Sequence, residues 1–180
     1  MSSIRLQDKT FVPYIAEEKI LAAVKNVANS INTDLAQKHP LFLVVLNGSF
    51  LFAADLLRNV NMDCEVSFMK LASYSGTGTT GTVKELIGLN ESVKDRHIVV
   101  VEDIVDTGNT IIAIHEQLKK HSPASIRIAT LLFKPGVYKK ELNIDYKGME
   151  IPNDFIVGYG LDYNGLGRNL RDIYVIKNDE

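Results

Sequence analysis

The chain has 180 residues, of which 46% are hydrophobic and 23% charged, and its formal net charge is −2. This length predicts one domain with a sizeable core, and the small net charge without a long basic run argues against nucleic acid or an anionic membrane as a partner. Cys64 is the only cysteine, which excludes an intrachain disulfide and a cysteine-based zinc site. Because no apolar run reaches the roughly 18 residues of a membrane span and no apolar leader stands at the start, we expect a cytoplasmic protein.

The first third of the chain predicts a helix, a buried strand and a second helix. Apolar residues recur at helical spacing over residues 14–37, and Pro13 suits the first turn of that helix. Residues 41–46 are apolar without alternation, which is typical of a strand that is buried on both faces. The next helix is expected over residues 50–60, with Ser49 as its N-cap.

The rest of the chain continues this alternation and then becomes irregular. The expected elements are strands at 64–71, 82–88, 97–101 and 125–133, a helix at 109–120, and two short strands at 155–157 and 173–176. Alternating strands and helices predict an α/β fold, with a mostly parallel twisted sheet flanked by helices. We expect a single domain over residues 1–180, with a core of about 14–135 and a small hood formed by about 1–12 and 137–180.

A glycine-rich stretch between two of these strands matches a well-known pattern without its usual context. Residues 76–81 read G-T-G-T-T-G, which fits the G-x-G-x-x-G of dinucleotide-binding loops. That site needs a strand before the glycines and a helix opening at the third one. Residues 82–88 are instead rich in β-branched side chains and end in glycine, so we favour a mobile loop over residues 73–81.

The most informative stretch is the acidic segment that follows the expected strand at 97–101. Glu102 and Asp103 can share a ligand only if the strand has already ended there, because successive strand residues point to opposite faces. Paired carboxylates suit ribose hydroxyls or a hydrated Mg²⁺ ion. Asp106 then precedes a turn of small residues at a helix start, which suits a phosphate group. The alternative is an ordinary acidic loop with an Asp cap.

Residues 100–110, V-V-E-D-I-V-D-T-G-N-T, resemble the phosphoribosyl pyrophosphate signature of type I phosphoribosyltransferases, in the form found in hypoxanthine-guanine phosphoribosyltransferases. Other pieces follow in family order. The resembling stretches are the pyrophosphate loop at 46–50, its following helix at 52–56, Ser73-Tyr74 of the long flexible loop, the strand at 131–134 and the hood at 154–164 with Arg168.

The resemblance implies a role for each matching residue. Ribose and phosphate binding would fall to Glu102, Asp103, Asp106, Thr107, Gly108, Asn109 and Thr110. Pyrophosphate binding would fall to Asn47, Gly48, Ser73, Tyr74 and Arg168. Purine binding would fall to Lys134, Phe155, Ile156 and Asp162. Mg²⁺ would be held by Glu102, Asp103 and Asp162, and the catalytic residue would be Asp106 as general base.

The chemistry of these residue types agrees with the implied roles. An ammonium has three donors and no acceptor, so Lys134 suits the carbonyl of a 6-oxopurine and offers nothing to the amino group of adenine. Phe155 would stack on the purine, and the backbone of Ile156 would face the base edge. Each residue also has an ordinary reading, as a surface lysine or a core aromatic. Asn47 stands where some relatives carry a lysine or arginine, and the family's cis peptide would fall at Leu46–Asn47.

The implied activity is purine salvage. Hypoxanthine, and guanine as well, would react with 5-phosphoribosyl 1-pyrophosphate to give IMP or GMP and pyrophosphate, with Mg²⁺ required. One alternative is a phosphoribosyltransferase for another base such as xanthine, and another is a ligand-sensing regulator on the same fold. By analogy with the family we also expect a homodimer or homotetramer.

Overall fold

The computed structural model describes residues 2–72, 84–87 and 91–177 and contains two sheets. The larger sheet has the order β5-β4-β3-β6-β7-β8, and the smaller one has the order β1-β2-β10-β9. The larger sheet consists of β3 (Leu41–Leu46), β4 (Glu65–Ala72), β5 (Lys84–Ile87), β6 (His97–Val105), β7 (Ser125–Phe133) and β8 (Tyr146–Glu150). The smaller sheet consists of β1 (Ile4–Leu6), β2 (Lys9–Ile15), β9 (Ile156–Val157) and β10 (Ile173–Ile176).

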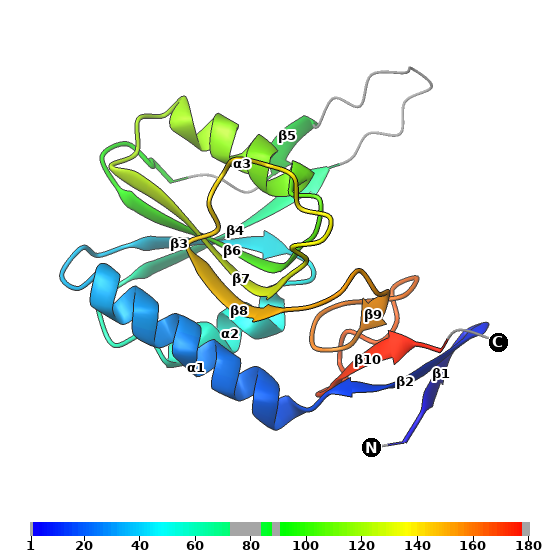
Figure 1. Ribbon diagram of the computed structural model, residues 1–180. Helices are drawn as coiled ribbons and strands as arrows, with labels where there is room; N and C mark the ends of the chain where they lie inside the picture. Colours follow the sequence, from blue (N-terminus) through cyan, green and yellow to red (C-terminus); the bar gives the residue numbers. More distant parts are fainter. Residues whose placement is uncertain (1, 73–83, 88–90, 178–180) are drawn as a thin grey trace.

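Five strands of the larger sheet run parallel, and only β5 is antiparallel to its neighbour. Helices α1 (Glu17–Asp34) and α2 (Phe50–Arg58) cover one face, and α3 (Asn109–Lys119) covers the other (Figure 1). Coverage on both faces explains why the first strand of the core, β3, is buried along nearly its whole length. The predicted α/β class is therefore confirmed.

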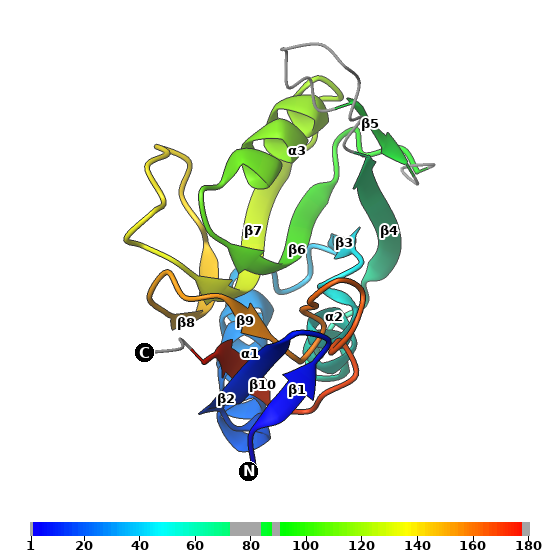
Figure 2. The same cartoon turned by 90° about the vertical axis from the view of Figure 1, so that its right-hand side faces the viewer.

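The smaller sheet and the loop from 158 to 172 form the hood, which lies beyond the carboxyl ends of β6 and β7 (Figures 1 and 2). The first and last strands of the described chain, β1 and β10, both belong to this hood (Figure 1). Its own small core contains Phe11, Val157 and Tyr174, separate from the two clusters that flank the larger sheet. Strand β8 falls within the range predicted for the hood, yet it pairs with β7 in the larger sheet.

The predicted start of the first helix is wrong, because Pro13 lies in β2 and the helix begins only at Glu17. A proline has no N–H for a ladder hydrogen bond and is found in strands mainly at edges or irregularities. Here the register of β2 against β10 shifts between Ile173 and Tyr174, and Tyr174 is the residue opposite Pro13. The shift accommodates the proline, so helical spacing around it misled the prediction.

Two further corrections concern the elements next to the acidic and pyrophosphate segments. Ser49 does not cap α2 with its side chain, because its hydroxyl donates a hydrogen bond to the Val45 carbonyl instead. Strand β6 does not end at residue 101 but continues to Val105, and its ladder with β7 includes the pairs Glu102–Thr130 and Val105–Phe133. The helix α2 also ends at Arg58, two residues before the predicted end.

The glycine pattern at 76–81 lies outside the described residues, as do Ser73 and Tyr74. The loop expected over 73–81 therefore stays a prediction. No helix in the described ranges is long and apolar enough to cross a membrane.

Candidate active site

A cavity of about 250 Å³ opens where the carboxyl ends of β6 and β7 meet the hood. In an open α/β sheet this end of the strands is the usual place for a ligand. Eight of the residues singled out from the sequence line it together: Gly48, Asp103, Asp106, Lys134, Phe155, Ile156, Asp162 and Arg168. They come from parts of the chain up to 120 residues apart, so their meeting is a result of the fold and not of sequence proximity.

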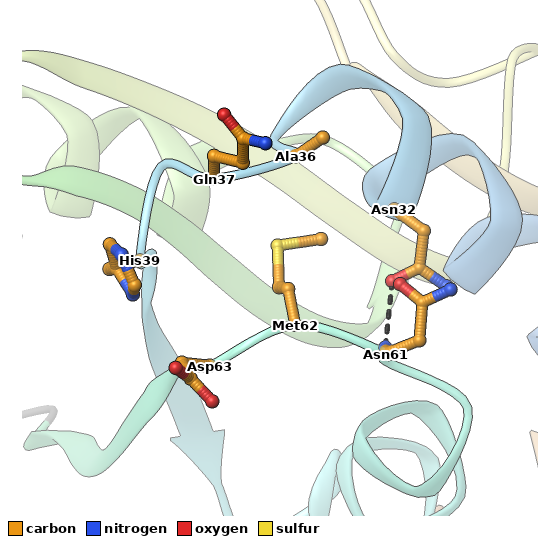
Figure 3. A pocket seen from close by; sticks show the side chains of 7 residues that line it. All are labelled: Asn32, Ala36, Gln37, His39, Asn61, Met62 and Asp63. Atoms are coloured by element: carbon orange, nitrogen blue, oxygen red, sulfur yellow. Dashed lines mark hydrogen bonds between the residues drawn. The ribbon is translucent and has the colours of Figure 1, made fainter.

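A second and larger cavity, of about 420 Å³, contains none of the predicted site residues. It is lined by Asn32, Ala36, Gln37, His39, Asn61, Met62 and Asp63 (Figure 3). These residues precede or flank the starts of β3 and β4, so this cavity lies at the amino ends of the parallel strands. Asn32 already accepts a hydrogen bond from the backbone N–H of Asn61 (Figure 3). Size alone would thus have pointed to the wrong end of the sheet.

Asp103 and Gly48 lie against each other at the floor of the site. A Cβ atom at Gly48 would fall 1.6 Å from Asp103 Oδ2, so only glycine fits beside this carboxyl group. The other oxygen, Oδ1, accepts a hydrogen bond from the Ile104 N–H at 2.8 Å. Burial raises the pKa of Asp103 to about 6, which makes it a carboxyl group that gains from a cationic partner.

Glu102 does not share the cavity with Asp103. The expected end of the strand before Glu102 is wrong, because β6 continues to Val105, and strand alternation directs the two side chains to opposite faces. Glu102 is 9% exposed, and within the described structure its Oε2 atom has no hydrogen-bond partner. Burial, and then the nearby charges of Asp103 and Asp106, raise the pKa of Glu102 well above its ordinary value.

The turn after β6 has the geometry of an anion-binding site. Asp106 accepts a hydrogen bond from the Thr107 N–H at 2.5 Å, and Gly108 adopts a left-handed conformation with φ of 80° as it leads into α3. The first intrahelical bond runs from Ile112 to the Gly108 carbonyl. The preceding N–H groups of Asn109 and Thr110 therefore have no helical acceptor and are available to a phosphate.

Tyr138 packs directly on this turn, a contact that the sequence did not reveal. A Cβ atom at Gly108 would lie 2.4 Å from Tyr138 Cε2. Tyr138 is itself fixed by a hydrogen bond from its hydroxyl to the Leu142 carbonyl and by an edge-on contact with the Phe133 ring. The aromatic ring thus supports the turn from the side of the loop that follows β7. Thr107 to Thr110 do not themselves line the 250 Å³ cavity, which contacts this segment through Asp106.

Lys134 connects the end of β7 to the hood. It is only 9% exposed, and its ammonium donates hydrogen bonds to the Asp154 carbonyl at 2.8 Å and to Asn153 Oδ1 at 3.3 Å. An ammonium has three N–H donors, so one more is available for a ligand in the cavity. Phe155, which follows Asp154 in the chain, is 47% exposed. The centroid of its ring lies 5.9 Å from that of Tyr163 and 6.2 Å from that of Phe11. The Phe155 ring is therefore open to a ligand, while the neighbouring aromatic rings hold the side chain in place.

The backbone of Ile156 points away from the rest of the smaller sheet. Ile176 N–H donates to the Phe155 carbonyl, which makes this pair a hydrogen-bonded one in the β9–β10 ladder. Hydrogen-bonded and non-hydrogen-bonded pairs alternate in antiparallel ladders, so the Ile156–Val175 pair is a non-hydrogen-bonded one. Since β9 is the last strand of its sheet, the N–H and C=O of Ile156 face the open edge, and Ile156 lines the cavity.

Arg168 and Asp162 form an ion pair on the hood side of the cavity. Arg168 Nη2 lies 2.5 Å from Asp162 Oδ1, and Nη1 donates to the Gly160 carbonyl at 2.7 Å. Asp162 also accepts a hydrogen bond from the Gly165 N–H at 2.6 Å. The guanidinium is thereby held in place with its remaining N–H groups available, which suits a phosphate or pyrophosphate group.

The segment 46–49 beneath the hood has an unusual backbone. The Leu46–Asn47 peptide bond is cis, as the resemblance to phosphoribosyltransferases implied. Gly160 of the hood packs on the Gly48 carbonyl so closely that a Cβ atom there would lie 1.9 Å from that oxygen. Asn47 does not line the cavity, so the chain brings Gly48 and not the Asn47 side chain to it.

Comparison with known proteins agrees with the geometry. Residues 14–164 match the model of the phosphoribosyl transferase domain. The chain therefore belongs to the phosphoribosyltransferase family. Within it, the chain is similar to hypoxanthine-guanine phosphoribosyltransferases. It is 37% identical to that of Streptococcus pneumoniae (92% of both chains) and 40% identical to that of Lactococcus lactis (91% of this chain, 89% of the relative).

Solved structures show the same relationship. A hypoxanthine-guanine phosphoribosyltransferase from Bacillus anthracis superimposes with a TM-score of 0.84 at 36% identity, covering 92% of this chain and 98% of the other. A hypoxanthine phosphoribosyltransferase from Trypanosoma cruzi gives the same TM-score and identity, covering 92% and 94%. The architecture and the family both follow from these matches.

Proposed function

We propose that this protein is a purine-salvage transferase. It transfers the phosphoribosyl group of 5-phosphoribosyl 1-pyrophosphate to hypoxanthine or guanine and releases pyrophosphate. The observation that carries the proposal is that Lys134 and Asp106 line one cavity together with the exposed ring of Phe155. A donor for a purine carbonyl, a base for a purine ring proton and a stacking surface are the three groups that this reaction needs on the side of the nucleobase.

The purine side is built for a 6-oxo base. The remaining N–H of Lys134 meets the O6 carbonyl, the ring of Phe155 stacks on the purine, and the free backbone of Ile156 faces the base edge. Adenine presents an amino group where Lys134 has no acceptor to offer. A site whose buried donor is left unpaired by the wrong ligand discriminates strongly, by up to about 10⁴-fold.

Asp106 acts where the purine bonds to the ribose, and Arg168 acts where the bond to pyrophosphate breaks. Asp106 accepts the proton from the purine ring nitrogen as that nitrogen bonds to the anomeric carbon of the ribose. The carbon–oxygen bond to pyrophosphate breaks on the opposite side, and Arg168 stabilises the negative charge that the pyrophosphate carries away. The amides of the Gly108–Thr110 turn bind the ribose phosphate, so the sugar is fixed between the two events.

The residues of the site also fit a Mg²⁺ ion that is shared with the substrate. Mg²⁺ commonly takes one or two carboxylates and completes its shell with waters and phosphate oxygens. Asp103 and Asp162 face the same cavity, and burial raises the pKa of Asp103 to about 6 even though the Arg168 guanidinium acts in the opposite direction. Among the described residues, no group of three or more His, Cys, Asp or Glu side chains that could hold a metal ion is found. When bound, the ion would neutralise charge on pyrophosphate.

One assay tests the proposal. Pyrophosphate release is measured with hypoxanthine, guanine, xanthine and adenine in parallel, each with Mg²⁺ and with EDTA. We expect release with hypoxanthine and guanine, none with adenine, and loss of activity in EDTA. A preference for xanthine would assign the protein to another base, and no release with any base would support a ligand-binding regulator instead.

We also expect the protein to form a homodimer or homotetramer in the cytoplasm. Val66 and Phe68 on β4 and Phe50 on α2 are 39%, 50% and 39% exposed, which is high for apolar side chains on regular elements. Light scattering coupled to size exclusion determines the assembly. A monomer at all concentrations would contradict this part of the proposal.

A further inference from the structure

One partly buried hydrogen bond joins the hood to the helix that follows the pyrophosphate loop. The hydroxyl of Tyr159 donates to Asp55 Oδ2 at 2.6 Å, across 104 positions of the sequence. Tyr159 is only 4% exposed and packs with the core cluster on the α1 and α2 side of the larger sheet. The second carboxylate oxygen, Oδ1, lies 3.7 Å from Arg58, so Asp55 is oriented from both sides.

The backbone at Tyr159 is held in a conformation that bulky residues rarely adopt. Its φ is +48°, between Gly158 at +102° and Gly160 at +99°. A large side chain in this left-handed region persists only where the surroundings fix it. Here the Tyr159 N–H donates to the Leu170 carbonyl at 2.9 Å, and the buried ring ends in the bond to Asp55.

The residue next to Tyr159 connects directly to the groups assigned to pyrophosphate. Gly160 packs against the Gly48 carbonyl, and its own carbonyl accepts the hydrogen bond from Arg168 Nη1. Its N–H donates to the Arg168 carbonyl at 2.9 Å. Gly160 therefore touches both the loop beneath the leaving group and the arginine that faces it, and a shift of Tyr159 would move both contacts.

We propose that the Tyr159–Asp55 hydrogen bond positions the pyrophosphate end of the site, by seating Gly160 on Gly48 and thereby aiming Arg168. The inference rests on the proposed function, because pyrophosphate is the ligand that these groups would bind. Tyr159 and Asp55 do not line the cavity, so they act as positioning residues. Burial and the neighbouring carboxylate of Asp55 also raise the pKa of Tyr159, which keeps its hydroxyl a donor across the physiological range.

The first test is Tyr159→Phe, which removes the hydroxyl and keeps the ring. We expect the KM for 5-phosphoribosyl 1-pyrophosphate, and the dissociation constant of pyrophosphate alone measured by calorimetry, to rise about tenfold, the size expected for a lost hydrogen bond to a charged group. The KM for hypoxanthine should stay essentially unchanged, because Lys134 and Phe155 are held by other contacts. A merely structural role would lower the melting temperature without this split between the two substrates.

The matched control is Tyr146→Phe. Tyr146 belongs to the same core cluster, is also 4% exposed, and lies on β8 away from the cavity. The Tyr146→Phe variant should have the same KM values for both substrates as the wild type. Asp55→Asn keeps an acceptor oxygen and should restore most of the pyrophosphate affinity that Asp55→Leu loses.

Equal pyrophosphate affinities in the wild type, Tyr159→Phe and Asp55→Leu, with all three folded, would overturn the positioning role. Failure of the proposed function is recognised separately, because the wild type itself would then release no pyrophosphate from any base. In that case the calorimetric titration with pyrophosphate still tests the Tyr159–Asp55 bond by itself.

Discussion

Two regions meet at the candidate active site, and they hold their functional groups in different ways. The carboxyl edge of the larger sheet presents Asp103 and Asp106 from β6 and the turn behind it, where β6 is paired with β3 as far as Val101 and with β7 as far as Val105. The hood presents Phe155 directly before the edge strand β9, and Asp162 with Arg168 from a loop that is held by turns and one ion pair.

In the proposed function this difference divides the roles of the two regions. The sheet edge would supply the general base and the anion-binding turn for the ribose phosphate. The hood would supply the stacking ring and the edge of β9 for the base, and Arg168 for the departing pyrophosphate. Lys134 links the two regions, because it directly follows β7 and donates to the hood backbone at Asp154. Substitutions on the two sides should therefore fail in different ways.

The largest effect is expected for Asp106→Asn on the sheet side. Asparagine has the same shape and can still accept the hydrogen bond from the Thr107 N–H, so the turn is retained. It cannot take up the purine proton, and kcat should fall by about 10²–10⁴-fold, the usual contribution of a general base. Steady-state pyrophosphate release gives kcat, and calorimetry gives the affinity for the phosphoribosyl donor. An equal loss of donor affinity would make Asp106 a binding residue.

Lys134→Ala should give the next largest effect, on the recognition side. Loss of a hydrogen bond from a charged donor costs about 1.5–3 kcal/mol, which corresponds to roughly 10- to 150-fold in kcat/KM for hypoxanthine. Exclusion of adenine should weaken at the same time. If adenine is still rejected as strongly by the variant, then Lys134 holds the hood through Asp154 and does not read the base. Parallel assays with both bases decide between these roles.

The sequence predicted the sheet side of this comparison better than the hood. The strand at 125–133 and the start of α3 at residue 109 were placed correctly, because continuous apolar runs and a Gly turn leave few alternatives. The error at Glu102 came from the same region. Two adjacent acids were taken as the end of the strand, whereas β6 continues and buries Glu102 on the other face.

The sequence predicted the approximate range of the hood but not all of its strands or its long-range contacts. Strands β1 and β2 were missed, and Pro13 was assigned to a helix. Strand β2 pairs with β10, which lies about 160 residues further along the chain, and β1 is joined to the sheet through β2. Contacts such as Tyr159 with Asp55, or Tyr138 on Gly108, have no local pattern at all. The resemblance to the family supplied the hood residues Phe155, Asp162 and Arg168, which periodicity could not.

Phe155→Ala tests the hood separately from the sheet edge, because it removes the surface on which the base would stack. Stacking of a base on an aromatic ring contributes about 1–3 kcal/mol, so the KM for hypoxanthine should rise by roughly tenfold while kcat stays near that of the wild type. Phe155→Tyr keeps the ring and should restore the wild-type KM. Because the side chain is half exposed, thermal denaturation should show little change in stability. A fall in kcat with an unchanged KM would instead place Phe155 among the groups that act in the reaction itself.

The smallest effect concerns the pH dependence of stability and tests how strongly the sheet edge is desolvated. Burial raises the pKa of Asp103 to about 6, whereas the ordinary value is 3.8. Between these values the folded protein holds a proton that the unfolded chain has lost. The free energy of unfolding must therefore fall as the pH rises, by at most about 1.4 kcal/mol per pH unit for one proton.

Urea unfolding between about pH 4.5 and pH 6, in EDTA, measures this slope. Asp103→Asn has no proton to lose at this position, so its stability should fall less steeply than that of the wild type. Part of the slope should persist in the variant, because burial raises the pKa of Glu102 in the same direction. Equal slopes of the free energy of unfolding against pH in the two proteins would mean that Asp103 is not desolvated in the folded state. The carboxyl edge of the sheet would then owe its role to geometry and not to a desolvated charge.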